Sequence, residues 1–150
     1  KGGKETYQRV LPSDIDFVKS FFDNSSNILF SADEMNNDID YHHIRAEQAV
    51  RAYNYYTERL KNEPEYRKQL EQEIEKRWKR KKIDKKTKKP KPFDKKEIRG
   101  QYHIRGKNKE LAKKKGLPLV YDRLALMAVS IFNLSHWRVD VTVSNYLLAN

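Results

Sequence analysis

The feature that most limits how this chain can fold is the uneven distribution of its charge. Residues 76–116 contain 20 lysines and arginines but four acidic residues, a net charge of +16. The other 109 of the 150 residues carry 12 basic and 17 acidic side chains, a net charge of −5. Ionised side chains are almost never fully buried without a partner. The hydrophobic core must therefore come mainly from the segments on either side of the basic stretch.

The centre of this stretch, from Lys79 to Pro92, reads Lys-Arg-Lys-Lys-Ile-Asp-Lys-Lys-Thr-Lys-Lys-Pro-Lys-Pro. Its prolines prevent a continuous helix and its lysines repel one another, so alone it should be disordered. We therefore expect a basic arm within an insert at about residues 79–116. A short helix is predicted to restart near Asp94, and a further basic element to run from Asn108 to Lys115.

Two segments before the basic stretch have the period of amphipathic helices. The first is predicted from about Tyr41 to Lys61, with a candidate N-terminal cap at Asp38 or Asp40. Its apolar stripe recurs every three or four residues: Ala49, Tyr53, Tyr56 and Leu60. The second helix begins near Pro64, and its apolar residues step by four: Tyr66, Leu70, Ile74 and Trp78. Together they predict an antiparallel helical hairpin.

The last 30 residues are the most apolar part of the chain. A helical stripe runs through them: Val120, Leu124, Met127, Ile131 and Leu134. A polar and aromatic connector, Ser135–Asp140, leads to a final helix predicted from Val141 to Ala149. Residues 139–143 also alternate like a strand, but a helix is the preferred interpretation.

These elements predict one all-α domain over residues 1–150, a small helical bundle with a basic lysine-rich arm. The absence of cysteine excludes disulfides and thiolate metal sites and is compatible with a reducing cytoplasm, where we expect the protein. No apolar run approaches the roughly 20 residues that cross a bilayer, so no membrane partner is expected. Because Lys1 stands in place of a starting methionine, the chain is expected to be trimmed or part of a longer protein.

The charge distribution predicts sequence-independent binding to RNA or DNA. Each basic side chain that contacts a phosphate releases condensed counterions, so affinity accumulates without any reading of bases. The candidate phosphate-binding residues are Arg77, Lys79, Arg80, Lys81, Lys82, Lys85, Lys86, Lys88, Lys89, Arg99, Arg105, Lys107, Lys109, Lys113, Lys114 and Lys115. Four rings among them are candidates for stacking on exposed bases: Trp78, Phe93, Tyr102 and His103. The alternative is a solvated charge run that contacts nothing.

No pattern in the sequence indicates catalysis, a metal or a cofactor. His42 and His43 are adjacent on a predicted helix and point about 100° apart, so they do not converge on one ion. His136 has no identifiable triad partner, and no glycine-rich loop suited to phosphates is present. We therefore expect a non-catalytic protein without a cofactor.

Two other functions fit parts of the sequence. Residues 121–149 are compatible with a helix-turn-helix DNA-binding protein of the replication or regulatory kind, with Thr142–Leu147 in the reading helix. That alternative predicts a sequence preference that depends on Asn145, although the helix contains no Arg or Lys and a core-forming helical pair is preferred. The second alternative is a protein-interaction adaptor whose basic arm meets an acidic partner.

The tyrosine-rich hairpin, the basic insert and the closing stretches Tyr121–Met127 and Ser135–Thr142 share a layout with a known family. Together they resemble the small subunit of the type I-D CRISPR interference complex, which corresponds to the C-terminal part of that system's large subunit. The resemblance implies a helical bundle that stacks in several copies within an RNA-guided ribonucleoprotein. Its expected partners are nucleic acid, other subunits and copies of itself. There it would support the guide–target duplex or the displaced DNA strand by backbone contacts.

Overall fold

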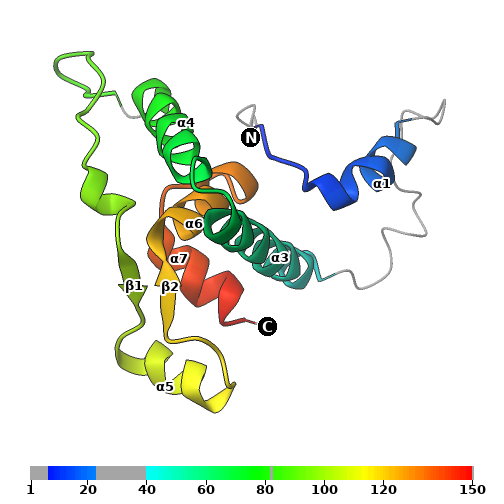
Figure 1. Cartoon of the computed structure of the whole chain (residues 1–150). Helices are drawn as coiled ribbons and strands as arrows, with labels where there is room; N and C mark the ends of the chain where they lie inside the picture. The colour runs from blue at the N-terminus through cyan, green and yellow to red at the C-terminus, as the bar shows by residue number, and fades with distance from the viewer. Residues whose placement is uncertain (1–6, 23–39, 82, 150) are drawn as a thin grey trace.

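The computed structural model describes residues 7–22, 40–81 and 83–149, and these are mainly helical (Figure 1). The longer elements are α1 (Ile15–Ser20), α3 (Tyr41–Asn62), α4 (Tyr66–Lys81), β1 (Gln101–His103), α5 (Gly106–Lys114), β2 (Val120–Asp122), α6 (Arg123–Ala128) and α7 (Val139–Thr142). Short 3₁₀ or π-helical segments are η1 (Pro12–Asp14), η2 (Lys95–Glu97), η3 (Val129–Asn133) and η4 (Val143–Leu147). Within the described residues, no helix combines the length and apolarity needed to cross a membrane.

The predicted first helix of the hairpin is confirmed as α3. The carboxylate of Asp40 accepts hydrogen bonds from the backbone N–H groups of His42 and His43, both at 3.0 Å, and so caps the helix. The other candidate cap, Asp38, lies outside the described residues. Three alanines and Tyr56 form the fully buried face of α3, which lets neighbouring helices approach its backbone closely.

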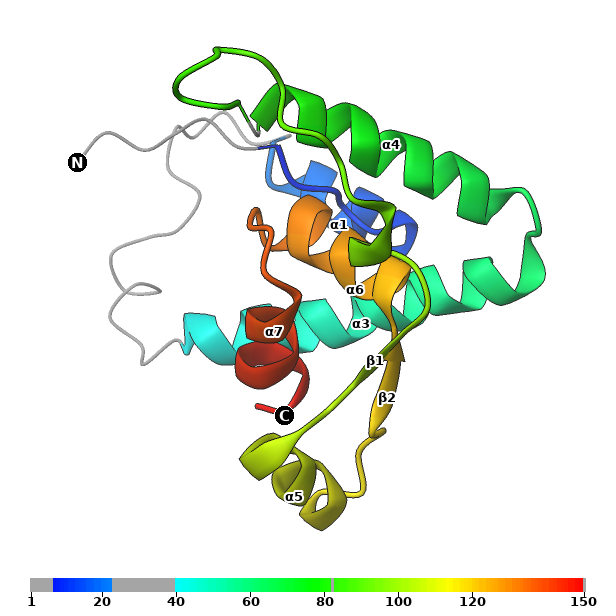
Figure 2. The same ribbon diagram turned by 90° about the vertical axis from the view of Figure 1, so that its left-hand side faces the viewer.

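The two helices of the predicted hairpin are present, but they do not pack mainly against each other. The chain reverses direction after Asn62, and the axes of α3 and α4 then diverge with α6 between them (Figure 2). α6 contacts both helices. The apolar side chains Leu70 and Ile74 on α4 are fully buried as the spacing predicted. The helical hairpin of α3 and α4 therefore opens into a wedge-shaped space, and α6 and the residues that follow it fill that space.

The filling segment, Leu124–Leu134, is buried at every position. The predicted one-sided stripe is therefore too narrow, and its first member, Val120, lies instead in β2 with 39% of its surface exposed. The buried polar groups of the segment have partners, as burial requires. The Tyr56 hydroxyl donates to Asn133 Oδ1 at 3.2 Å, and Ser130 Oγ donates to the Leu126 carbonyl at 2.8 Å.

The end of the chain is helical, as preferred over a strand. α7 and η4 run from Val139 to Leu147, and η4 packs against α3. Val139, Val143 and Leu147 are buried on one side of this helix, so the two β-branched valines serve as core side chains. Tertiary packing therefore overrides their strand preference.

The expectation of an all-α domain is wrong in one place. β1 and β2 form a two-stranded antiparallel ribbon in which Tyr102 faces Tyr121 across the pair. The pairing joins segments that are separated by α5, which lies at the far end of the ribbon (Figure 1). Strands of three residues are too short for an alternating pattern to reveal them. We call the unit from Gln101 to Asp122 the finger.

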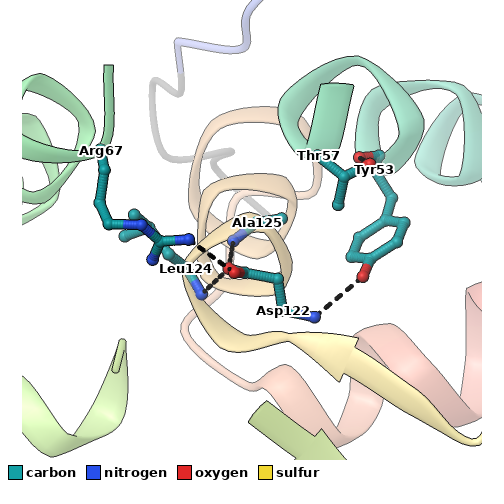
Figure 3. Close-up of polar contacts among 6 residues, drawn as sticks. All are labelled: Tyr53, Thr57, Arg67, Asp122, Leu124 and Ala125. Carbon is teal, nitrogen blue, oxygen red and sulfur yellow. Dashed lines mark hydrogen bonds and ion pairs between the residues drawn. The ribbon is translucent and has the colours of Figure 1, made fainter. Parts of the chain in front are cut away.

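One carboxylate joins the finger to the helical body. Asp122 Oδ1 accepts from the backbone N–H groups of Leu124 and Ala125, at 2.9 and 3.1 Å, and caps α6 (Figure 3). Asp122 Oδ2 accepts from Arg67 Nη2 of α4 at 2.8 Å. The Asp122 N–H donates to the Tyr53 hydroxyl of α3 at 2.9 Å, and burial raises the pKa of Tyr53 to about 12. Asp122 therefore holds β2, α3, α4 and α6 together.

Candidate nucleic-acid interface

The basic stretch lies along one side of the molecule. It leaves the end of α4, passes through a loop and η2, and continues through β1 to α5, along the left-hand edge in Figure 1 and across the face toward the viewer in Figure 2. Ile98 and Ile104 are buried and attach the middle of this path to the core. The fold therefore places the described residues of this stretch along one side of the molecule, and we call them the basic edge (residues 79–81 and 83–116).

The loop in this band is folded, although the sequence alone predicts disorder for it. Ile83 pairs with Pro90 in an antiparallel bridge, the Asp84 N–H donates to the Lys89 carbonyl at 2.9 Å, and the Lys88 N–H donates to the Asp84 carbonyl at 3.0 Å. We call residues 83–90 the basic hairpin.

The Asp84 side chain accounts for this order. Its Oδ1 accepts from the N–H and hydroxyl groups of Thr87, at 2.8 and 3.1 Å, and from the Lys86 N–H at 3.0 Å. These hydrogen bonds, led by the Thr87 N–H, lower the pKa of Asp84. One acidic residue inside the lysine run thus organises a turn that charge counting alone does not predict.

An aromatic cluster closes the foot of the loop. The Trp78 ring lies 5.2 Å from the rings of both Phe93 and Trp137, and its indole N–H donates to the Lys91 carbonyl at 3.0 Å. Trp78 comes from α4, Phe93 from the far end of the loop and Trp137 from the C-terminal connector. The cluster therefore ties both ends of the loop to the body. Two of the four predicted stacking rings, Trp78 and Phe93, are in it.

The lysines in the basic hairpin and directly after it are exposed to solvent. Those exposed are Lys85, Lys86, Lys88, Lys89 and Lys91. None of the five is in an ion pair with a carboxylate of the described residues. Lys91 is absent from the predicted set, as are the exposed Lys95 and Lys96, although the same charge argument identifies all three.

Other predicted phosphate contacts are partly engaged within the fold. Arg77 donates to the Tyr7 carbonyl at 2.8 Å and lies 5.4 Å from the Phe132 ring, so it attaches the N-terminal segment. Lys79 forms an ion pair with Glu75 at 3.0 Å. Lys115 Nζ donates to the Leu148 carbonyl at 2.9 Å and attaches the end of α5 to the C-terminal helix. Lys82 and the side chains of Arg80 and Lys81 lie outside what the structure describes.

The finger presents a second cationic group. Its exposed basic residues include Arg105, Lys107, Lys109, Lys113 and Lys114, and Arg99 is exposed just before β1. On α5, Ala112 is buried and Lys113 pairs with Glu110 at 3.5 Å. Between this group and the hairpin, the Tyr102 ring is half-buried with the Arg123 guanidinium 5.6 Å from its centroid, whereas His103 is exposed.

The residues that the alternative functions would use form smaller groups than the basic edge. In the helix-turn-helix alternative, Asn145 is exposed and accepts from the Ser144 hydroxyl at 2.8 Å, and the nearby Arg138 is paired with Asp140 at 2.7 Å. His43 lies 3.5 Å from Glu47. In the part of the chain that the structure describes, no three His, Cys, Asp or Glu side chains gather in a way that could hold a metal ion.

Comparisons with known proteins add no relative. No protein-family model, curated protein or solved structure matches the chain. The basic edge is thus defined by its own residues: an exposed lysine hairpin and a cationic finger, each attached to an apolar helical body.

Proposed function

We propose that this protein is a non-catalytic module that binds the phosphate backbone of nucleic acid through its basic edge, without reading sequence. The observation that carries the proposal is that every basic side chain that the structure describes in the basic edge is exposed. The backbone that carries these side chains runs along one side of the fold, from the end of α4 to α5 (Figure 2). Lysine ammonium groups act as point charges toward phosphate and carry little geometric information about bases.

The ordered backbone of the basic hairpin favours this proposal over a solvated charge run that contacts nothing. A run kept for solubility needs no defined backbone, yet the hairpin is held by the Asp84 carboxylate and the Trp78–Phe93–Trp137 cluster. Ordering like charges side by side costs electrostatic free energy, which a polyanion would offset. The basic edge therefore has the properties of a prearranged cationic surface.

The resemblance to the type I-D CRISPR small subunit suggests the setting. In that setting the basic edge would face the guide–target duplex or the displaced DNA strand, and the guide RNA would supply the sequence reading. Other subunits, and further copies of this chain, would contact the remaining surface.

The test is a salt titration of binding to fluorescent oligonucleotides by the full chain and by two matched variants. One variant carries Lys85→Ser, Lys86→Ser and Lys89→Ser. The control removes three exposed lysines of the helical elements, with Lys19→Ser, Lys61→Ser and Lys68→Ser. If all three hairpin lysines contact duplex phosphates, the slope of log K against log salt should become shallower by about 3.

The control should lose far less affinity and keep the wild-type slope, although its net charge falls equally. If both variants lost the same affinity, net charge alone would explain the loss, and the basic edge would not be the binding site. A chain that binds no oligonucleotide even at low salt would favour the adaptor alternative. Binding that survives the lysine changes but fails with Asn145→Ala would favour the helix-turn-helix alternative.

A further inference from the structure

We infer that the basic edge takes double-stranded nucleic acid in preference to single strands. This inference rests on the proposed function and adds the class of ligand. It follows from where the fold places the rings of the basic stretch and from how its two cationic groups are held.

The first argument concerns stacking. Proteins that bind single strands combine a basic groove with aromatic platforms, and each stacked base contributes about 1–3 kcal/mol. Here Trp78 and Phe93 are half-buried against each other, and Tyr102 is half-buried beside Arg123. Among the described residues of the basic edge, His103 is the one exposed ring. The edge therefore supplies phosphate contacts with little surface on which unpaired bases could stack.

The second argument concerns rigidity. The basic hairpin and α5 lie at opposite ends of the edge, with β1 between them (Figure 1). Each end is attached to the body: the hairpin by the aromatic cluster, the finger by Asp122 and by Lys115 on the Leu148 carbonyl. Two cationic groups held apart match a duplex, whose phosphates are already fixed in space. A flexible strand would lose conformational freedom to bridge them.

The third argument concerns charge density. A DNA duplex carries one phosphate per about 1.7 Å of its axis, and neutralising each one releases more counterion than on a single strand. With stacking largely absent, this electrostatic contribution decides the preference. At equal salt, the duplex should bind at least about tenfold more tightly than a single strand of the same length.

The experiment compares a mixed-sequence duplex of about 30 base pairs, as DNA and as RNA, with oligo(dT) and oligo(rU) of the same length, using the full chain at one salt concentration. Tryptophan fluorescence is recorded in the same titrations. The chain's two tryptophans, Trp78 and Trp137, both lie in the aromatic cluster, so their emission reports directly on base stacking there. We expect a tenfold or greater duplex preference and little quenching by oligo(dT).

The outcomes separate this inference from the proposed function. If no oligonucleotide binds, the proposed function fails. If single strands bind within tenfold of the duplex or more tightly, the duplex preference is wrong while backbone binding stands. Strong quenching by oligo(dT) would show that bases reach the cluster and would also overturn the inference. His103→Ala should leave the ratio of duplex to single-strand affinity unchanged, and a selective loss of single-strand affinity would count against the inference.

Discussion

The helical segment Leu124–Leu134 and the basic hairpin differ in how the fold surrounds them. The first is buried at every position and contacts α3 and α4. The second exposes its lysines and is attached at its foot by Trp78 and internally by Asp84. This contrast indicates that the buried segment Leu124–Leu134 supplies much of the folding free energy. Substitutions in the basic hairpin should cost little of it. Four predictions test that separation.

The largest effect on stability is expected in the wedge. Leu126 is fully buried, so Leu126→Ala should lower the free energy of unfolding by about 3 kcal/mol. In the hairpin, Ile83 is 41% exposed, and Ile83→Ala should cost less than about 1 kcal/mol. Chemical denaturation of both variants measures the difference. Equal losses would mean that the hairpin is part of the cooperative core.

A smaller loss is expected where the finger meets the body. Asp122→Ala removes the cap of α6 and the partly exposed ion pair with Arg67, for a combined cost of about 1.5 kcal/mol. It should also speed amide hydrogen exchange in β1, because the finger loses one of its attachments to the body. Asp140→Ala, which breaks an exposed pair with Arg138, is the matched control and should change stability by less than about 0.5 kcal/mol. A finger that stays protected without Asp122 would contradict its role as the joining residue.

A still smaller loss of stability is expected at the foot of the basic hairpin, where Trp78 lies. Trp78→Phe keeps a ring in the cluster but removes the hydrogen bond to the Lys91 carbonyl, at a cost of about 1 kcal/mol. The hairpin amides should exchange faster, and duplex affinity should fall about threefold because a looser loop loses more entropy on binding. The salt slope should stay the same since no charge changes. A reduced slope would show that Trp78 itself controls phosphate contacts.

The smallest effect concerns pH. Burial, aided by the Arg45 and Arg138 charges, lowers the pKa of His136 below its usual 6.5. The folded state therefore binds fewer protons than the unfolded state, and stability should fall as pH decreases from about 7 through 6.5 and below. His136→Gln should flatten this part of the pH–Tm curve, and His103→Gln, which changes an exposed histidine, is the matched control. A curve with the same slope in His136→Gln would assign the pH dependence to other groups.

Much of the helical framework could be predicted from residue spacing. The stripe Tyr66, Leu70, Ile74 follows one face of α4, and the acidic residue before Tyr41 caps α3 as expected. These features depend on local periodicity and on side chains within one turn, which a sequence displays directly. The candidate site could be predicted as a set of charges, because charge is a property of residues and not of their arrangement.

What the amino-acid order determined by itself is thus the helical body, the segregation of +16 into residues 76–116 and the exposure that such charge demands. The tertiary structure decided what depends on distant partners: the β1–β2 pairing, the wedge formed by α6, and the joining of Trp78, Phe93 and Trp137. The physical reason is that each of these contacts links segments far apart in the chain. Their free energy appears when the core has brought them together, and no short stretch of sequence encodes it.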